Sequence, residues 1–299
     1  MISFSAIYFA LSDVDPITGT IFRMAYALPV LFVLWWVVRD RDNRPRSRRW
    51  LAAGAGFMLA IDVFLWHEAI NHIGAGLATL IANSQVIWVA IGAWLIHKER
   101  PRRTTLFAVP VVLSGVALVS GIGQEGAFGT RPLLGAVLAF VAALFYATFL
   151  LGYRASNDSF APQAAPLIEA TLGGLFGALL IGVVLGRGLD LVPTFPAHWW
   201  LIALGVSAQA IGWLLIGYAL PRLPATETAT IILLQPVLTM VWGAIFFSEN
   251  PSRLQLIGAL VVLAGVGFVA LNRASGPDAV GDSATQDDNE QHAGRALDH

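Results

Sequence analysis

Residues 132–153 read PLLGAVLAFVAALFYATFLLGY, a stretch of 22 residues without a charged side chain, and this stretch decides the fold class. An α-helix rises about 1.5 Å per residue, so about 20 apolar residues cross the hydrocarbon core of a membrane. Arg131 and Arg154 flank the stretch on either side, where a spanning helix would return to water. The stretch therefore predicts a transmembrane helix.

Apolar runs of similar length recur along almost the whole chain, separated by short connections rich in Arg, Asp, Pro and Gly. The eight further runs cover residues 17–38, 50–70, 74–96, 104–122, 163–185, 198–219, 225–247 and 253–271. A tenth run, from Ile2 to Leu11, covers only about half of a bilayer. We expect that part of this first helix precedes Met1; a half-helix or a re-entrant segment is the alternative.

The overall composition agrees with lipid as the solvent. Of the 299 residues, 57% are hydrophobic and 12% are charged, whereas soluble domains carry about 25% charged residues. A net charge of −1 and a single lysine, Lys98, argue against binding of nucleic acid. Cysteine is absent, which excludes disulfides and cysteine-ligated metals. We therefore predict an all-α polytopic membrane protein without a cofactor.

The basic residues predict the orientation in the membrane. With ten crossings, thirteen Lys and Arg residues fall on the connections of one side and three on those of the other. Because cytoplasmic loops carry the excess of positive charge, we expect both termini to be cytoplasmic and the protein to lie in the cell (inner) membrane. The polar, acidic residues 272–299 lack apolar periodicity and are predicted to form a disordered cytoplasmic tail.

The chain contains an internal repeat. Shifted by 150 residues, residues 50–121 align without a gap with residues 200–271 and share 20 identities in 72 positions. Membrane composition inflates chance matches among Leu, Val and Ala, but it does not place rarer residues in register. The rarer matches are Trp50 with Trp200, Gln85 with Gln235, Glu99 with Glu249, Pro101 with Pro251, and Arg103 with Arg253. The sequence thus predicts two five-helix repeats, residues 1–122 and 132–271.

An odd number of helices in each repeat inserts the second copy with the opposite topology. Inverted repeats of this kind can exchange conformations and expose a site at the membrane midplane first to one side and then to the other. The repeat therefore favours a transporter. The alternative is that duplication merely enlarged the helix bundle.

Short motifs in this order resemble proteins with two EamA-type repeats of the drug/metabolite transporter superfamily. They are Asp15-Pro16 followed by Arg23, Glu99-Arg100-Pro101, Glu249-Asn250-Pro251, Leu113-Ser114-Gly115-Val116, Leu263-Ala264-Gly265-Val266 and Gln235-Pro236-Val237. The resemblance covers roughly residues 5–271 and implies ten helices and gradient-driven transport. The short first helix departs from the family pattern. So does Val86, which aligns with Pro236 and puts a kink in the fourth helix in doubt.

Polar side chains inside the predicted helices are the candidates for a site, because such groups are costly in hydrocarbon. Asp62 and Trp66 lie four residues apart and so share a helix face, and Gln209 and Trp213 repeat this spacing in the eighth helix. In the repeat alignment the two pairs are three residues out of step, so they are analogous and not superposed. The alternative is a packing role for Asp62 and a lipid-facing or interfacial position for the tryptophans.

The amides of the fourth and ninth helices extend this set. Asn83-Ser84-Gln85 forms a polar break at mid-depth, and Gln85 aligns with Gln235. Amides can bind a substrate or hydrogen-bond across helices. We predict a substrate site formed by Asp62, Trp66, Asn83, Gln85, Gln209, Trp213 and Gln235.

Two carboxylates are candidates for proton coupling, Asp62 and Glu169, because a carboxylate removed from water favours its protonated form. Arg23 and Glu169 each lie seven residues after a proline and could form a gate pair, a coupling site or charges that reach the membrane interface. We interpret Arg23 as such an interfacial charge. Glu249, at a helix end beside Pro251, is interpreted as structural.

The sequence lacks a phosphate-binding loop of the ATPase type, so ATP is not expected to drive transport. His67 and His72 are five residues apart and cannot share a helix face as zinc ligands of a protease would. We predict a secondary transporter, an exporter of a small metabolite or drug and not an enzyme. Its expected partners are membrane lipid, a small-molecule substrate and protons, as a monomer or homodimer. The alternative is a membrane-embedded binding or regulatory protein without transport activity.

Overall fold

The computed structural model describes residues 2–97, 103–120, 127–157, 162–186, 189–219 and 225–274. Within these ranges the chain forms helices and no strand. The first half contains η1 (Ile2–Phe4), α1 (Ser5–Ser12), α2 (Pro16–Val38), η2 (Arg39–Arg41), α3 (Arg46–Ala82), α4 (Gln85–His97) and α5 (Arg103–Val119). The second half contains α6 (Pro132–Ser156), α7 (Ala164–Val184), α8 (Ala197–Ala203), the π-helical η3 (Leu204–Gly212), α9 (Trp213–Ala219), α10 (Ala225–Phe247) and α11 (Arg253–Ala274).

Six segments within the described ranges are long and apolar enough to cross a membrane. They are Pro16–Arg41, Arg46–Ala82, Pro132–Ser156, Ala164–Val184, Ala197–Tyr218 and Arg253–Leu271. Shorter apolar helices cover Ile2–Ser12, Leu106–Val119 and Leu234–Phe247. The polytopic α-helical membrane fold is thus confirmed. The predicted tail lies outside the described residues from residue 275 onward.

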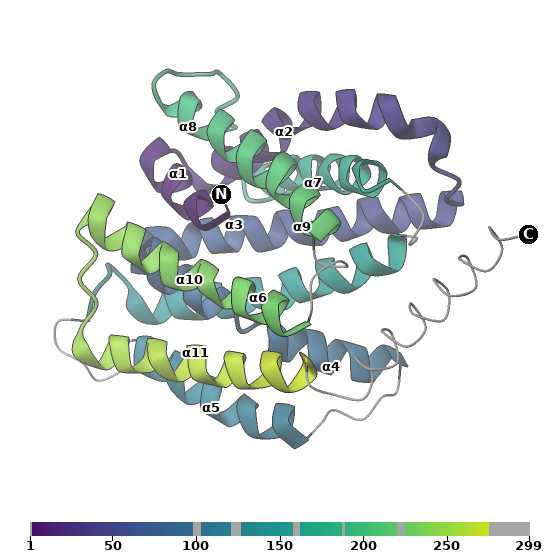
Figure 1. Ribbon diagram of the computed structural model, residues 1–299. Coiled ribbons are helices and arrows are strands. Elements are labelled where there is room, and N and C mark those ends of the chain that lie inside the picture. Colours follow the sequence, from purple (N-terminus) through teal and green to yellow (C-terminus); the bar gives the residue numbers. More distant parts are fainter. Residues whose placement is uncertain are drawn as a thin grey trace, which may run out of the picture.

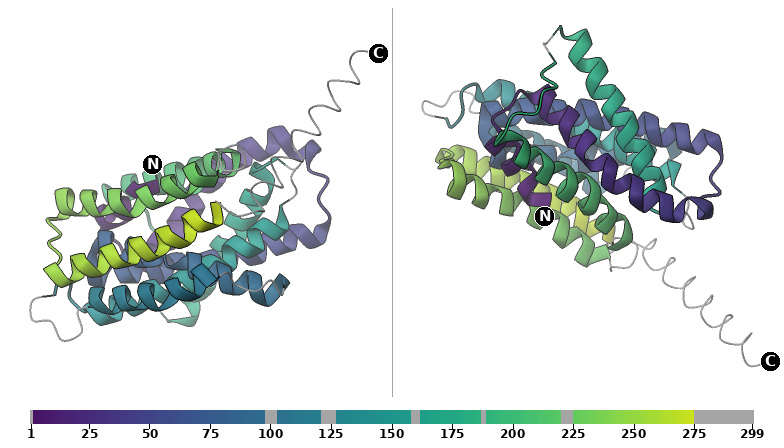
Figure 2. Two further views of the ribbon diagram at one scale, coloured as in Figure 1. Left: turned by 60° about the horizontal axis from the view of Figure 1, so that its bottom comes forward. Right: turned by 90° about the horizontal axis from the view of Figure 1, so that it is seen from above.

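The helices run roughly along one direction and form a single bundle (Figure 1). The α3 helix packs against α6 and α7, α2 packs against α7 and η3, and α5 packs against α11. Figure 2 shows α5 and α11 side by side at one edge of the bundle. The connections at residues 39–45 and 248–252 lie at opposite ends of the bundle (Figure 1).

Close helix crossings depend on small residues. A Cβ atom at Gly56 would overlap the Ala170 carbonyl, so α3 and α7 approach backbone to backbone. At the crossing of α5 and α11, a Cβ at Gly115 would lie 2.8 Å from the Gly258 carbonyl oxygen. Small residues allow such contacts in lipid, where van der Waals packing between helices replaces the hydrophobic effect.

Gly74 separates the third and fourth predicted runs. Its φ of 79° and ψ of 167° break α3, so the chain turns and a second helical segment begins. This backbone conformation is readily adopted only by glycine. The Glu249 carboxylate accepts hydrogen bonds from the backbone N–H groups of Ala75 and Gly76, at 2.6 and 3.0 Å. Glu249 therefore caps a helix start of the other half, which agrees with its predicted structural role.

Two irregular segments lie in the middle of the bundle. Asn83 and Ser84 form a turn between α3 and α4, so the fourth run is interrupted even though Val86 replaces the proline of the second repeat. The turn coincides with the polar stretch Asn83-Ser84-Gln85, so the helix breaks here without a proline. The eighth run changes to π-helix over Leu204–Gly212, a geometry often found at functional sites.

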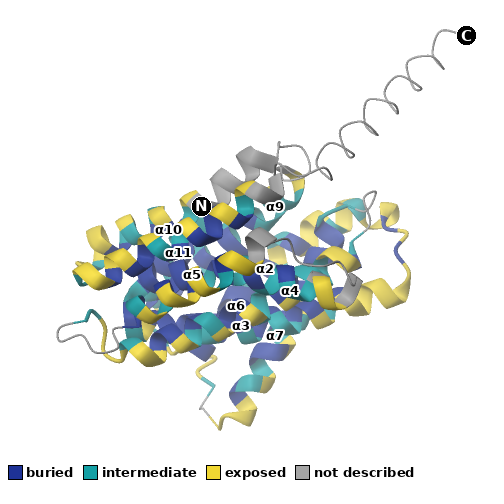
Figure 3. Ribbon diagram, turned by 90° about the horizontal axis from the view of Figure 1, so that it is seen from below, coloured by how far each residue is buried: buried dark blue, intermediate teal, exposed yellow. Residues whose placement is uncertain are grey.

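The outer surface of the bundle is apolar. Exposed residues follow the outward faces of the helices, whereas buried residues lie between them (Figure 3). Examples of exposed apolar side chains are Phe107, Phe176, Val184, Ile245 and Leu260. A soluble protein rarely exposes so large an apolar area, so lipid is the medium that fits this surface.

Candidate functional site

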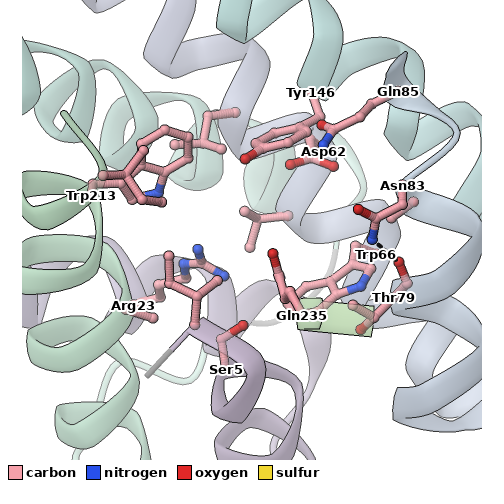
Figure 4. Close-up of a pocket in the computed structure, with 16 residues that line it drawn as sticks. Ser5, Arg23, Asp62, Trp66, Thr79, Asn83, Gln85, Tyr146, Trp213 and Gln235 are labelled. Atoms are coloured by element: carbon pink, nitrogen blue, oxygen red, sulfur yellow. Dashed lines mark hydrogen bonds between the residues drawn. The ribbon is translucent and has the colours of Figure 1, made fainter. Parts of the chain in front are cut away.

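A cavity of about 100 Å³ lies inside the bundle, and helices from both halves of the chain line it (Figure 4). The first half contributes side chains from η1, α1, α2, α3 and α4, and the second half from α6, η3, α9 and α10. The lining residues are Ile2, Ser5, Arg23, Leu59, Asp62, Val63, Trp66, Thr79, Ala82, Asn83, Gln85, Tyr146, Ala208, Trp213, Ile216 and Gln235. Apolar walls with a few convergent polar groups are typical of small-molecule sites.

Six of the seven predicted substrate residues line this cavity. They are Asp62, Trp66, Asn83, Gln85, Trp213 and Gln235. The helical spacing brought Asp62 and Trp66 to one wall, as the sequence indicated, because residues four apart share a helix face. The structure thus brings these residues together, and their role in binding stays a prediction.

Gln209, the seventh residue, is fully buried behind the wall. Its Oε1 accepts a hydrogen bond from Arg23 Nε at 3.1 Å, and its Nε2 donates to Thr171 Oγ1 at 3.5 Å. Gln209 therefore orients Arg23 and does not itself line the cavity.

The interpretation of Arg23 as an interfacial charge is wrong. The residue is only 7% exposed, and its side chain points into the cavity (Figure 4). The cause is tertiary: α2 packs against η3, which places Gln209 beside the guanidinium. The guanidinium carbon also lies 6.0 Å from the ring centroid of Trp66, within the range of a cation–π contact.

Asp62 lies across the cavity from Arg23 (Figure 4). It is 7% exposed, and within the described part of the chain its carboxylate has no hydrogen bond and no basic group within 4 Å. A buried charge without a partner is costly. Packing alone would favour an apolar residue at this position, and the role of Asp62 in binding or proton coupling stays a prediction.

Aromatic rings form another part of the wall. Trp213 packs edge-on against Phe149, with ring centroids 5.1 Å apart and perpendicular planes. Tyr146 and Tyr153 contact the same indole, at centroid distances of 6.1 and 6.2 Å. Tyr146 was not predicted because it stands inside an uninterrupted apolar run, where no periodicity marks an inward face. Ser5 and Thr79, two further lining residues, were not predicted because small hydroxyl residues are common in membrane helices.

The side-chain amides of Asn83 and Gln85 differ in their hydrogen bonding. Asn83 Nδ2 donates to the Thr79 carbonyl at 2.8 Å, which ties it to its own helix. The Oε1 atom of Gln85 is buried and has no hydrogen-bond partner. An unpaired buried acceptor of this kind is available to a donor on a bound molecule.

Glu169 lies away from the cavity, in an ion cluster at the end of the bundle that carries the connection between α2 and α3. Arg44 donates from Nε to Asp42 Oδ1 at 2.8 Å and from Nη2 to Glu169 Oε2 at 2.9 Å. Arg49 Nη2 lies 3.4 Å from Asp42 Oδ2. Burial alone would raise the pKa of Asp42, but the hydrogen bonds and charge of Arg44 hold it below its ordinary value.

A metal site finds no support in the described ranges, where no group of three or more His, Asp or Glu side chains could hold an ion. His67 is buried, stacks on Phe9 at 3.7 Å and lies 3.2 Å from Thr20 Oγ1. His72 contacts Thr130 instead. These two histidines therefore make different local contacts.

The chain is similar to transporters over nearly its whole length. The EamA-like transporter family matches residues 2–121 and again residues 133–271. The uncharacterized transporter YcbK of Bacillus subtilis (strain 168) is 23% identical over 265 residues, which cover 85% of this chain and 82% of the relative. A probable terminal-alkyne amino-acid exporter of Streptantibioticus cattleyicolor is 28% identical over 230 residues, covering 75% and 74% of the two chains.

A solved structure shares the fold. A protein known by its crystal structure superposes with a TM-score of 0.59 at 18% identity, and the match covers 90% of this chain and 97% of that one. Two family matches in tandem, the apolar helices and the transporter names of the relatives agree with one another. The chain belongs to the EamA-like transporter family and is a multi-pass membrane transporter, not an enzyme.

Proposed function

We propose that this protein is a secondary active transporter that exports a small metabolite or drug across the inner membrane by alternating access. The observation that carries the proposal is the buried cavity, whose polar lining comes from both halves of the chain. A site between two similar bundles can open to either side when the bundles rock against each other. Its lining combines space with two buried side-chain oxygens that have no hydrogen-bond partner, Gln85 Oε1 and Thr79 Oγ1.

The pattern of helix contacts supports two inverted repeats of five helices, residues 1–122 and 132–271. In the two predicted repeats α1 corresponds to α6, α3 to α8, and α4 to α10. The contact between α3 and α6 therefore has its counterpart between α8 and α1, and the contact between α4 and α6 has its counterpart between α10 and α1. The α2–α7 and α5–α11 pairs are converted into themselves. A contact pattern that survives this exchange is what a pseudo-two-fold axis requires.

The distribution of charges supports cytoplasmic termini. Six arginines lie within residues 39–49 and Arg154 lies at the end of α6, and an excess of positive charge is typical of the cytoplasmic side. The ion cluster of Asp42, Arg44, Arg49 and Glu169 then lies at the cytoplasmic end. One chain supplies every wall of the cavity, so a monomer suffices for transport whether or not a homodimer forms.

Within the site, we assign substrate contacts to Asp62, Trp66, Asn83, Gln85, Trp213 and Gln235, with Gln209 as the residue that orients Arg23. Asp62 is the proposed proton-coupling carboxylate because it is buried and unpaired. Glu169 is proposed to couple protons at the cytoplasmic end, where a proton and Arg44 compete for the same carboxylate. Export as the direction is supported by the relative described as a probable exporter.

Transport assays in proteoliposomes test the proposal. Purified protein would be reconstituted, and the movement of a labelled metabolite panel would be followed with and without a proton gradient, for wild type, Asp62→Asn and Asp190→Asn. Asp190 lies on the connection before α8 and is exposed, so its variant controls for the loss of a carboxylate. We expect one compound to accumulate against its gradient, and Asp62→Asn alone to abolish the dependence on the proton gradient.

The outcomes separate the alternatives. Gradient-driven accumulation that is unchanged in Asp62→Asn would refute proton coupling through Asp62 while leaving transport intact. Binding of panel compounds without any flux would instead support the binding or regulatory alternative.

A further inference from the structure

An apolar groove lies on the outer surface of the bundle between α2 and α7, apart from the central cavity. Its volume is about 390 Å³, and the two helices that form it pack against each other. All six lining side chains are apolar; they are Ala25, Leu28, Pro29 and Phe32 of α2 and Ile168 and Leu172 of α7. Phe32 and Leu172 are each 50% exposed. The groove therefore presents apolar groups to whatever molecule lies beside the bundle.

The wall that α2 contributes continues as a stripe beyond the groove. Its members are spaced three or four residues apart and so share one helix face; they are Ala25, Pro29, Phe32, Trp36 and Arg39. The ring centroids of Phe32 and Trp36 lie 5.9 Å apart, and the guanidinium carbon of Arg39 lies 3.6 Å from the ring centroid of Trp36. Apolar groove, tryptophan and arginine thus follow one another along one face of α2.

The length of this stripe matches one leaflet of a membrane. At a rise of about 1.5 Å per residue, the stripe from Ala25 to Phe32 covers about 10 Å, and the stripe from Ala25 to Arg39 covers about 21 Å. Half of the hydrocarbon core is about 15 Å thick, and the polar region adds about 5–7 Å on each side. The groove therefore lies at the depth of acyl chains. Trp36 lies at the interface, where tryptophan is enriched, and Arg39 lies at the depth of the phosphates.

The end of the bundle beyond the groove carries an excess of positive charge. Residues 39–49 contain six arginines and two aspartates, and Glu169 approaches them from α7. Arg44 is occupied by the ion cluster described above. Arg41 and Arg46, in contrast, are exposed and have no ion pair with a described residue. Basic clusters of this size beside a membrane helix attract anionic lipid headgroups.

Arg39 is the basic residue that the stripe places at the mouth of the groove. Its side chain is 39% exposed, and its Nε lies 3.7 Å from Oδ1 of Asp40, whose own side chain is 93% exposed. An exposed ion pair of this kind contributes little to stability, so a phosphate competes readily for the guanidinium. Two parallel N–H bonds from a guanidinium to phosphate oxygens are the stronger arrangement.

We propose that the groove between α2 and α7 binds one anionic phospholipid, with an acyl chain in the groove, the glycerol region beside Trp36 and the phosphate on Arg39. This site is separate from the central cavity, and its occupation does not depend on the proposed transport or on any substrate. An acyl chain gains little by leaving other acyl chains, so the charge of the headgroup decides which lipid occupies the site. A second copy of the chain fits less well, because a two-fold contact would bring the same arginines of both copies together.

Native mass spectrometry of the purified protein in detergent tests this proposal. The probes are dioleoyl phosphatidylglycerol and dioleoyl phosphatidylcholine, which share their acyl chains and differ in net headgroup charge. Each arginine near the surface favours an anionic lipid by a factor of about five. Because several arginines surround the site, we expect the first phosphatidylglycerol to bind at least about tenfold more tightly than phosphatidylcholine. Glycerol phosphate, which carries the charge without acyl chains, should not displace it.

Variants test the two ends of the site separately. Arg39→Gln should weaken binding of phosphatidylglycerol about fivefold and leave phosphatidylcholine unchanged, whereas Arg131→Gln, at the residue before α6, should keep both affinities. Leu172→Trp should weaken binding of both lipids, because the larger ring fills the groove. Phe176→Trp, one turn further along α7 and outside the groove, should not. All four side chains are exposed, so the changes leave the packed core intact.

The proposal is overturned if phosphatidylcholine binds wild type as tightly as phosphatidylglycerol, or if Arg39→Gln and Arg131→Gln bind alike. Unchanged lipid binding in Leu172→Trp would show that the acyl chain lies elsewhere and would equally refute the site. Displacement of the lipid by glycerol phosphate would assign the arginines to a free phosphate compound instead. A dimer that carries no lipid and that Leu172→Trp dissociates would assign the groove to a second copy of the chain.

Discussion

Replacement of Glu249 by alanine tests how the two halves of the bundle are held together. Glu249 precedes α11 in the second half, yet its carboxylate receives the N–H groups of Ala75 and Gly76 in the first half. These N–H groups begin a new helical segment directly after the break at Gly74. Donors at a helix start have no partner within the helix, so a side chain must supply one.

The size of the effect follows from these two bonds. Loss of the carboxylate leaves two buried donors unpaired, at about 1–3 kcal/mol each, and removes an N-terminal cap worth about 0.5–2 kcal/mol. Because these contributions overlap, we expect Glu249→Ala to lower the free energy of unfolding by about 2–4 kcal/mol. Each kcal/mol shifts Tm by about 2–4 °C for chains of about 150–250 residues, and this chain of 299 residues falls at the low end, so Tm should fall by about 4–8 °C.

Thermal unfolding in detergent, followed by intrinsic tryptophan fluorescence, measures this change. Asp190→Asn is the control, because Asp190 accepts a single backbone N–H bond, from Val192 at 3.3 Å, on an exposed connection. Its Tm should stay within about 2 °C of wild type, as is usual for surface positions. A Tm of Glu249→Ala that is equally close to wild type would show that water or rearrangement satisfies the two donors, and the reasoning would fail.

Three further predictions concern other parts of the bundle. Arg44→Leu should lower the free energy of unfolding by about 1–3 kcal/mol, because it removes the hydrogen bonds that Asp42 and Glu169 accept from Arg44 and leaves only their longer ion pairs with Arg49; thermal unfolding measures the loss. Gly56→Ala should reduce the yield of folded protein, since its Cβ would overlap the backbone of α7, whereas Gly54→Ala, which meets nothing within 4 Å, should not; size-exclusion chromatography compares them. Burial raises the pKa of Glu249 above 4.5. Its contribution to the free energy of unfolding is therefore complete below pH 4.5 and declines as the pH rises through the raised pKa. Tm measured against pH should show this decline in wild type but not in Glu249→Gln.

Each of these expectations has a clear contrary result. Arg44→Leu with unchanged Tm would mean that the cluster is solvated and contributes little. Equal yields of the two glycine variants would mean that α3 and α7 separate at no cost. An identical pH profile in Glu249→Gln would assign the titration to another group.

The polytopic helical fold and the family with its two tandem matches were predictable from the sequence. A membrane-crossing helix is recognised by the length of one apolar run, and bilayer thickness sets that length without reference to any neighbour. Two breaks coincide with local features of the sequence: Gly74 separates the third and fourth predicted runs, and the polar Asn83-Ser84 pair interrupts the fourth. Asp62 was predicted as a site residue because ionisable side chains inside an apolar run are rare and costly in hydrocarbon.

The tertiary structure decided which side chains share the cavity. Arg23 and Gln209 are 186 residues apart in the sequence, and only the packing of α2 on η3 brings them together. Tyr146 and Arg23 could not be assigned an orientation in advance, because a helix that is apolar all round carries no stripe that distinguishes its inward face. In a membrane the length of each helix is thus determined by its own residues. Its rotation about its own axis is determined by packing against helices that are distant in the sequence.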